Sequence, residues 1–181
     1  QIAVPRWSPD GKAVAFIEGL MSDEGFHGGD LFTIASDGQK ISNRTKGRKT
    51  SISSLFWQKP DRIIVTEIVG GGSAISELNL ADNLTRTIWQ APEHVHAFGN
   101  FPNFALSEDG KFAAAVRNNY ETPPEVWSGP LGDWEQLTKN NKGLTPSWGR
   151  AENLEWTNEG FGTQGWLIPP GQVEPGRKYP M

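Results

Sequence analysis

Short apolar segments alternate with turns along most of this chain. Within the segments apolar and polar residues alternate, which is the spacing of a half-buried β-strand. The intervening stretches are rich in Gly, Pro, Asp and Asn, the residues that favour tight turns. Apolar spacing at the helical period is sustained nowhere, so the pattern predicts almost no helix. We therefore expect an all-β protein made of short antiparallel strands.

The segments form a unit that occurs three times. Each unit opens with a turn and an apolar strand: Trp7-Ser8-Pro9-Asp10-Gly11-Lys12 before 13–17, Trp57-Gln58-Lys59-Pro60-Asp61-Arg62 before 63–65, and Leu106-Ser107-Glu108-Asp109-Gly110-Lys111 before 112–116. The units start 50 and then 49 residues apart. This period, with several strands per unit, is typical of a β-propeller. The middle copy lacks the Gly, so its turn should differ in geometry.

Each unit continues with a second hairpin, which turns at about 36–38, 81–83 or 129–133. Two hairpins make one four-stranded antiparallel blade. The sequence therefore predicts a partial β-propeller over 1–148, with three blades at about 1–47, 48–98 and 99–148. A further hairpin, which turns at Asn158-Glu159-Gly160, falls within 149–181.

Composition narrows the class of protein. The chain has 8 Trp, 9 Phe, 21 Gly and 13 Pro in 181 residues, a balance that favours strands and turns. The net charge is −4 with both signs interspersed, so no basic stripe is available for nucleic acid. Cysteine is absent, which excludes disulfides and thiolate metal sites.

The chain contains no apolar run near the roughly 20 residues that a membrane-spanning helix requires. We therefore expect a soluble protein without a membrane partner. The sequence starts at Gln1, within a predicted strand, so any targeting segment would have been removed or would lie upstream, and the residues do not decide between the bacterial cytoplasm and the periplasm.

The C-terminal stretch carries the most specific motifs: Glu152 to Gly160, then Gly165-Trp166-Leu167-Ile168-Pro169-Pro170, then Pro175-Gly176-Arg177-Lys178-Tyr179-Pro180. This arrangement resembles the start of the α/β-hydrolase domain in serine peptidases of the prolyl oligopeptidase family. The Trp-Ser-Pro-Asp-Gly-Lys turn resembles the propeller repeat that these peptidases share with the periplasmic protein TolB. The segment 19–30 is similar to that of bacterial acylaminoacyl-peptidases and dipeptidyl-aminopeptidases.

The resemblance implies that 1–148 is the C-terminal part of a peptidase propeller and that 149–181 is the first hairpin and linker of a truncated hydrolase domain. The Ser-His-Asp triad would then lie beyond Met181. The chain itself, which has no Gly-x-Ser-x-Gly motif, should hold no catalytic residue and be inactive. The parent enzyme would hydrolyse peptides with acylated or free N-termini, and its propeller would gate access. Endopeptidase or exopeptidase action and the preferred P1 residue stay open.

Blade geometry predicts which loops surround a substrate path. In a four-stranded blade, the link between strands two and three lies on the side where strand four ends. The loops 18–30, 68–73 and 118–124 should therefore lie on the side of the C-terminal hairpin, and the turns at Asp10, Asp37 and Asp109 on the opposite side.

Two of these loops carry candidate substrate-facing residues: Asp23, Glu24 and His27 in the first, and Tyr120 and Glu121 in the third. Some aminopeptidases of the family use propeller carboxylates to hold the α-ammonium group of a substrate, a charge-assisted contact. The alternative is that these acids are solvated or cap local turns through backbone amides.

Other residues are assigned structural roles. His94 and His96 have a spacing seen in metal sites, but only Glu93 is nearby, so we expect neither a metal nor another cofactor. Four tryptophans recur at matching blade positions and are expected to pack between blades rather than to stack on sugars: Trp7, Trp57, Trp89 and Trp127. Trp156 and Trp166 are expected to pack between the hairpin and its neighbours.

Three blades cannot close a ring, so we expect an open arc or a homodimer that buries the free blade flanks. The other expected partners are a peptide substrate and the missing hydrolase domain. An alternative function also fits the repeats: a TolB-like propeller that binds a protein partner and has no catalytic activity.

Overall fold

The computed structural model describes residues 1–19, 28–95 and 103–179. These residues form fourteen strands and no helix. The strands are β1 (Ile2–Trp7), β2 (Ala13–Glu18), β3 (Asp30–Ala35), β4 (Ser42–Asn43), β5 (Ser51–Lys59), β6 (Arg62–Val69), β7 (Gly72–Asn79), β8 (Thr85–Ala91), β9 (Phe104–Leu106), β10 (Phe112–Arg117), β11 (Glu125–Pro130), β12 (Glu135–Gln136), β13 (Glu152–Asn158) and β14 (Phe161–Leu167).

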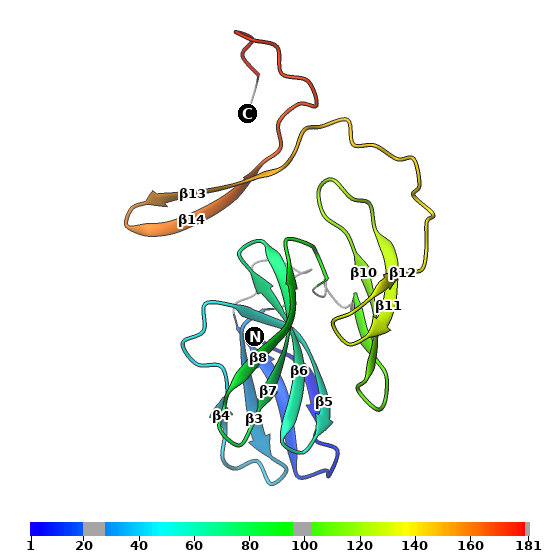
Figure 1. Ribbon diagram of the computed structural model, residues 1–181. Coiled ribbons are helices and arrows are strands. Elements are labelled where there is room, and N and C mark those ends of the chain that lie inside the picture. The colour runs from blue at the N-terminus through cyan, green and yellow to red at the C-terminus, as the bar shows by residue number, and fades with distance from the viewer. Residues whose placement is uncertain (20–27, 96–102, 180–181) are drawn as a thin grey trace.

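The strands assemble into three antiparallel sheets of four strands, each in chain order: β1 to β4, β5 to β8 and β9 to β12. β13 and β14 form a separate hairpin (Figure 1). This confirms the predicted all-β class, the three blades and the terminal hairpin. Among the described residues there is no helix that could cross a membrane.

The turns that open the blades have two geometries. In the first blade the Ser8 hydroxyl donates to Asp10 Oδ1 at 2.7 Å, and Gly11 has a positive φ of 69°. The third blade repeats this with Ser107 and Asp109 at 2.7 Å, and Gly110 has a φ of 71°. Glycine adopts a positive φ without steric cost, which explains why glycine occupies this position of the turn.

The middle blade has a tighter turn, which agrees with the prediction that this turn differs in geometry. β5 and β6 remain paired up to Lys59 and Arg62, with a register shift just before the turn. Trp57 consequently pairs with Ile63, whereas Trp7 pairs with Val14 in the first blade. The connection is one residue shorter, so Val14 and Ile63 occupy equivalent positions in their blades.

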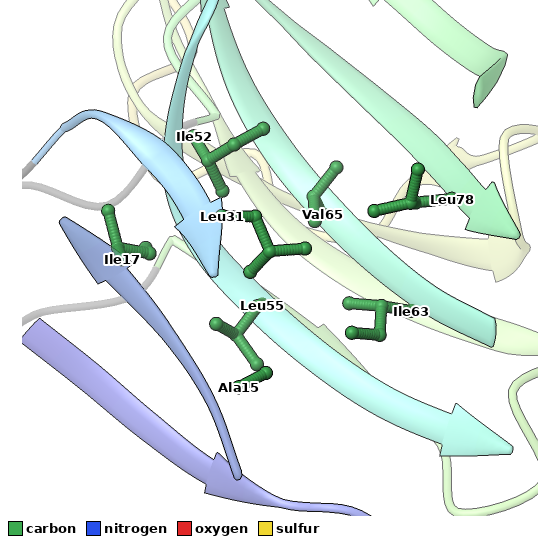
Figure 2. Packing of buried hydrophobic residues seen from close by; sticks show 8 residues of the cluster. All are labelled: Ala15, Ile17, Leu31, Ile52, Leu55, Ile63, Val65 and Leu78. Carbon is green, nitrogen blue, oxygen red and sulfur yellow. The ribbon is translucent and has the colours of Figure 1, made fainter. Parts of the chain in front are cut away.

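Apolar side chains fill both spaces between neighbouring blades. The cluster between the first and second blades contains Ala15, Ile17, Leu31, Ile52, Leu55, Ile63, Val65 and Leu78 (Figure 2). The cluster between the second and third contains Ile64, Ile75, Val95, Phe104, Ala113, Ala115 and Trp134. Successive residues of a strand point to opposite faces of the sheet. The run Ile63-Ile64-Val65 therefore supplies both clusters from one strand.

The tryptophan prediction is correct for three of the four residues. Trp57 packs against the first cluster, and Trp89 and Trp127 pack against the second. The prediction is wrong for Trp7, whose surface is 62% exposed. Trp7 lies opposite Val14, on the face of the first blade that points away from the second, and so meets neither cluster.

Candidate functional site

The β13–β14 hairpin lies across the ends of the second and third blades, where β6 turns into β7 and β10 turns into β11 (Figure 1). Trp166 of β14 makes the contact with both turns. Its ring centroid is 5.1 Å from that of Tyr120, in the loop between β10 and β11. This confirms the predicted side of the hairpin for the loops 68–73 and 118–124.

Gly71 allows Trp166 to approach the second blade. It has a positive φ of 80° in the two-residue turn between β6 and β7. A Cβ atom at this position would lie 2.5 Å from Trp166 Cζ2 and 2.7 Å from Gln164 Nε2. A larger residue would therefore have both backbone strain and a collision with the hairpin.

Tyr120 is the centre of a small aromatic cluster. Its ring lies perpendicular to the His94 imidazole at 5.6 Å, an edge-to-face arrangement that aromatic pairs favour. The Tyr120 carbonyl oxygen accepts a 2.8 Å hydrogen bond from Trp148 Nε1. Burial lowers the pKa of His94 below its ordinary value of 6.5, because the charged form loses hydration. The cluster therefore presents a neutral, apolar surface at pH 7.

Glu121 contacts the linker that leads into β13. Its Oε1 atom accepts a 2.7 Å hydrogen bond from the Ala151 amide. The Glu121 amide in turn donates to Asn119 Oδ1 at 2.9 Å, which shapes the loop. These bonds give Glu121 a structural role in holding the linker. Contact of Tyr120 or Glu121 with substrate stays a prediction.

The other three candidates, Asp23, Glu24 and His27, lie outside the described residues, as does His96. Within the described ranges no group of three His, Cys, Asp or Glu side chains could hold a metal ion.

The Asp-Gly turns on the opposite side are held by hydrogen bonds to their own Asp side chains, which agrees with the structural role predicted for them. Asp10 and Asp109 accept hydrogen bonds from Ser8 and Ser107. These hydroxyl bonds, followed by the backbone amides two residues on, lower the pKa of both carboxyl groups below 3.8. Asp37 accepts a 2.9 Å bond from the Gln39 amide.

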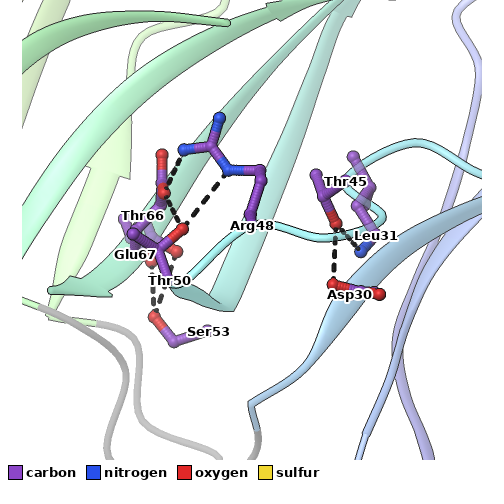
Figure 3. A network of polar contacts seen from close by, with 8 residues as sticks. All are labelled: Asp30, Leu31, Thr45, Arg48, Thr50, Ser53, Thr66 and Glu67. Atoms are coloured by element: carbon purple, nitrogen blue, oxygen red, sulfur yellow. Dashed lines mark hydrogen bonds and ion pairs between the residues drawn. The ribbon is translucent and has the colours of Figure 1, made fainter. Parts of the chain in front are cut away.

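Charged residues also close each junction between blades, a feature that the sequence reasoning missed. Glu67, only 1% exposed, receives Arg48 Nη2 and Thr50 Oγ1 on the same oxygen, each at 2.5 Å (Figure 3). At the next junction Arg117 binds both oxygens of Glu93 at 2.7 and 2.8 Å. The signal available in the sequence was a charge at the end of an apolar strand.

An apolar groove of about 630 Å³ opens on the C-terminal hairpin and the segment after it. Its lining includes Leu154, Trp156, Trp166, Pro169 and Tyr179. Trp156 is 49% exposed, so of the two hairpin tryptophans it is Trp166 that packs against the blades. The groove exposes apolar surface of the kind that packs against an apolar surface of another segment or protein.

No protein-family model matches this chain, and neither does any curated protein. Solved structures match its fold. A puromycin hydrolase has a TM-score of 0.61 and 17% identity, with 77% of this chain and 22% of the hydrolase covered. A putative dipeptidyl aminopeptidase IV from Bacteroides ovatus has a TM-score of 0.60 and 13% identity, with 99% and 35% covered.

Solved structures of proteins that are not named as peptidases or hydrolases share the same fold. TolB from Acinetobacter baumannii has a TM-score of 0.52 and 18% identity, with 93% of this chain and 41% of TolB covered. An oligogalacturonate lyase in complex with manganese has a TM-score of 0.59 and 14% identity. These likenesses identify propeller blades. This chain spans less than half the length of each of these structures.

Proposed function

We propose that this chain is the C-terminal part of the propeller, together with the entry hairpin of the hydrolase domain, of a serine peptidase of the prolyl oligopeptidase type. In this proposal 1–148 belongs to the propeller, and 149–181 begins a hydrolase domain that carries a Ser-His-Asp triad. The propeller would gate the access of peptides with acylated or free N-termini to that triad.

One observation supports the proposal most strongly: the hairpin with the peptidase-like motif is docked on the blades. Trp166, from Gly165-Trp166-Leu167, packs on Tyr120 and against Gly71. The hairpin therefore lies on the same side of the blades as the links between strands two and three. A domain continuing from this hairpin would sit over those loops, where a gate must be. Two structural neighbours are named as puromycin hydrolase and dipeptidyl aminopeptidase IV.

The chemistry would come from the hydrolase domain. In a triad, His accepts the proton of the attacking Ser hydroxyl and Asp orients the imidazole. In this proposal Tyr120 and His94, which are in edge-to-face contact, would form a neutral, aromatic wall of the substrate path. Such a wall accepts apolar side chains of a peptide and gives no charged competitor to the triad.

The proposal can be tested on the gene and on the protein. The reading frame beyond Met181 should encode a strand, then His-Gly-Gly, then Gly-x-Ser-x-Gly. The extended protein should hydrolyse chromogenic acylated or free-amine dipeptides, and substitution of the elbow Ser by Ala should abolish that activity. The 181-residue chain alone should hydrolyse neither substrate. Activity in the short chain, or an extended protein without the elbow, would contradict the proposal.

A second function has the TolB structure in its favour: a propeller that binds a protein partner without catalysis. The two functions differ in the kind of domain that they require after the hairpin. A binding propeller needs no catalytic elbow, so an extended reading frame that contains only blades would favour this alternative.

A further inference from the structure

One segment of the chain concentrates positive charge. The net charge of the whole chain is −4, yet the segment 38–60 contains no Asp or Glu. Five Lys or Arg residues lie within 40–49: Lys40, Arg44, Lys46, Arg48 and Lys49. These ten residues include β4 and most of the linker that joins the first blade to the second. The excess of cations therefore lies at a junction between blades.

Three of these cations line a polar cleft of about 360 Å³ at this junction. β4 and the linker form one wall of the cleft, and the turn from β7 into β8 forms the other. The lining residues are Asn43, Arg44, Thr45, Lys46, Arg48, Asn83, Leu84 and Thr85, and none of these described residues carries a carboxylate. The first and second blades thus both contribute hydrogen-bond donors to the cleft.

Neutral acceptors hold Arg44 in the wall of the cleft. Its Nε atom donates a 2.7 Å hydrogen bond to Oγ1 of Thr33, which is 4% exposed. Its Nη1 atom donates longer bonds to the Leu80 carbonyl oxygen at 3.4 Å and to Asn83 Oδ1 at 3.3 Å. None of the ion pairs among the described residues includes Arg44 or Lys46. Arg44 is therefore half-buried and oriented, but no carboxylate neutralises its charge.

The carboxylates that contact the lining bind other groups in it. Glu67 pairs with Arg48, so the charge of this third cation is neutralised. Asp30 accepts hydrogen bonds from Asn43 Nδ2 at 2.6 Å and from Thr45 Oγ1 at 3.2 Å (Figure 3 shows the Thr45 contact). The positive charge left in the cleft is that of Arg44 and Lys46.

We propose that this cleft binds the phosphate group of a small molecule. A phosphomonoester carries a charge of about −1.5 to −2 at pH 7, which matches the two free cations. Arg and Lys both form charge-assisted hydrogen bonds with phosphate oxygens. The bonds of Arg44 within the described residues use Nε and Nη1, which leaves Nη2 for the ligand. The Thr85 hydroxyl is a further donor in the lining.

The lining favours a small phosphate compound over a nucleic acid. Leu84 is its one apolar residue, and none of its residues is an aromatic side chain on which a base could stack. Asp82, in the turn that forms the second wall, is not in the lining and accepts the Leu84 amide at 2.9 Å. A ligand in the cleft would contact two blades and stabilise their junction. The site does not depend on the proposed peptidase function, because every residue in it belongs to the blades.

Calorimetric titration of the 181-residue chain with glycerol phosphate, at constant ionic strength, tests the site. One ligand should bind per chain, with a dissociation constant below about 1 mM. Glycerol, which lacks the phosphate, should not bind. Arg44→Gln should weaken binding about tenfold, because a charge-assisted bond is lost. Lys46→Gln should weaken it about threefold. Lys49→Gln is the control, because Lys49 is an exposed cation of the same linker outside the lining.

Nuclear magnetic resonance locates the ligand. Titration should shift the amide signals of Arg44, Lys46 and Thr85, which lie on both walls. If Arg44→Gln does not fold, Lys46→Gln still decides, because the Lys46 side chain is exposed and its loss leaves the fold intact. Binding that is absent, that glycerol reproduces or that Lys46→Gln leaves unchanged would overturn the proposal. A chain that binds an oligonucleotide but not glycerol phosphate would also overturn it.

Discussion

Trp57 and Trp7 occupy the same position in successive blades and have opposite surroundings. Trp57 packs into the cluster between the first and second blades, whereas Trp7 is 62% exposed. The difference does not come from the residue type or from its position in the blade, since Trp7 pairs with Val14 and Trp57 pairs with the equivalent Ile63. It comes from the neighbouring blade, because the first blade packs on Trp57 whereas no described blade packs on the face that carries Trp7.

The comparison shows that blades behave as units of a linear array. In such arrays stability is approximately a sum of terms within each unit and terms between nearest neighbours. The middle blade has two closed junctions and contributes Ile63, Val65 and Leu78 to one cluster and Ile64 and Ile75 to the other. The outer blades each have one. The middle blade should therefore be the most stable part of the chain.

The largest expected effect is at the buried ion pair. Arg48→Ala would leave the Glu67 carboxylate buried without its cation, which costs about 3–5 kcal/mol of unfolding free energy. Glu18→Ala, at the equivalent exposed position, should cost less than about 0.5 kcal/mol. Chemical denaturation of both variants measures the difference. Equal losses of unfolding free energy in the two variants would show that burial at the junction between blades does not determine the effect of the ion pair.

A double substitution sharpens that result. Arg48→Met combined with Glu67→Leu removes both charges and fills the space with apolar groups. Such exchanges of buried pairs are often neutral or stabilising. The double variant should therefore recover most of the loss, and a loss as large as that of Arg48→Ala alone would contradict the account.

The matched tryptophans give the next effect. Trp57→Ala should cost about 2–4 kcal/mol, because it empties space in the first cluster. Trp7→Ala should cost less than about 0.5 kcal/mol under conditions in which the chain is monomeric. Thermal and denaturant unfolding compare the pair directly. Similar costs at the two positions would mean that the neighbouring blade does not decide their burial.

A smaller and local effect is expected at the hairpin. Trp166→Ala removes the contact with Tyr120 and should raise the hydrogen-exchange rate of β13 and β14 amides by about tenfold, equivalent to about 1.4 kcal/mol of docking. Trp156→Ala, in the same hairpin but 49% exposed, is the control and should have little effect. Unchanged exchange in both would show that Trp166 does not hold the hairpin on the blades.

The sequence was sufficient for the blades but not for the contacts between distant segments. The Pro-Asp-Gly turns and the strand alternation are local signals, so the three sheets and the odd middle turn could be predicted from them. The docking of Trp166 on Tyr120 joins residues far apart along the chain, and periodicity contains no such information. The repeat predicted that Trp7 packs between blades as Trp57 does, but the matching position alone could not show that no described blade lies against it.

The smallest expected effect is on the pH dependence of stability in acid. Hydrogen bonds from the Thr138 hydroxyl and then from the Asn141 amide lower the pKa of Glu125 below 4.5 in the folded chain. A lowered pKa stabilises the fold above pH 4.5, and the contribution is lost as the pH falls through the folded value. Unfolding between pH 6 and pH 3 should therefore be less pH-dependent in Glu125→Gln than in the wild-type chain. Parallel pH profiles would contradict this, and Glu135→Gln, in exposed β12, is the control.

Hydrogen exchange followed by mass spectrometry tests the central claim most directly. With the chain monomeric, amides of β6 and β7 should exchange most slowly, because both of their faces are covered by neighbouring blades. Amides of β2 and β10, each in a blade with one free face, should exchange faster. Equal protection across all three blades, or slowest exchange in an outer blade, would contradict an array held together by its junctions.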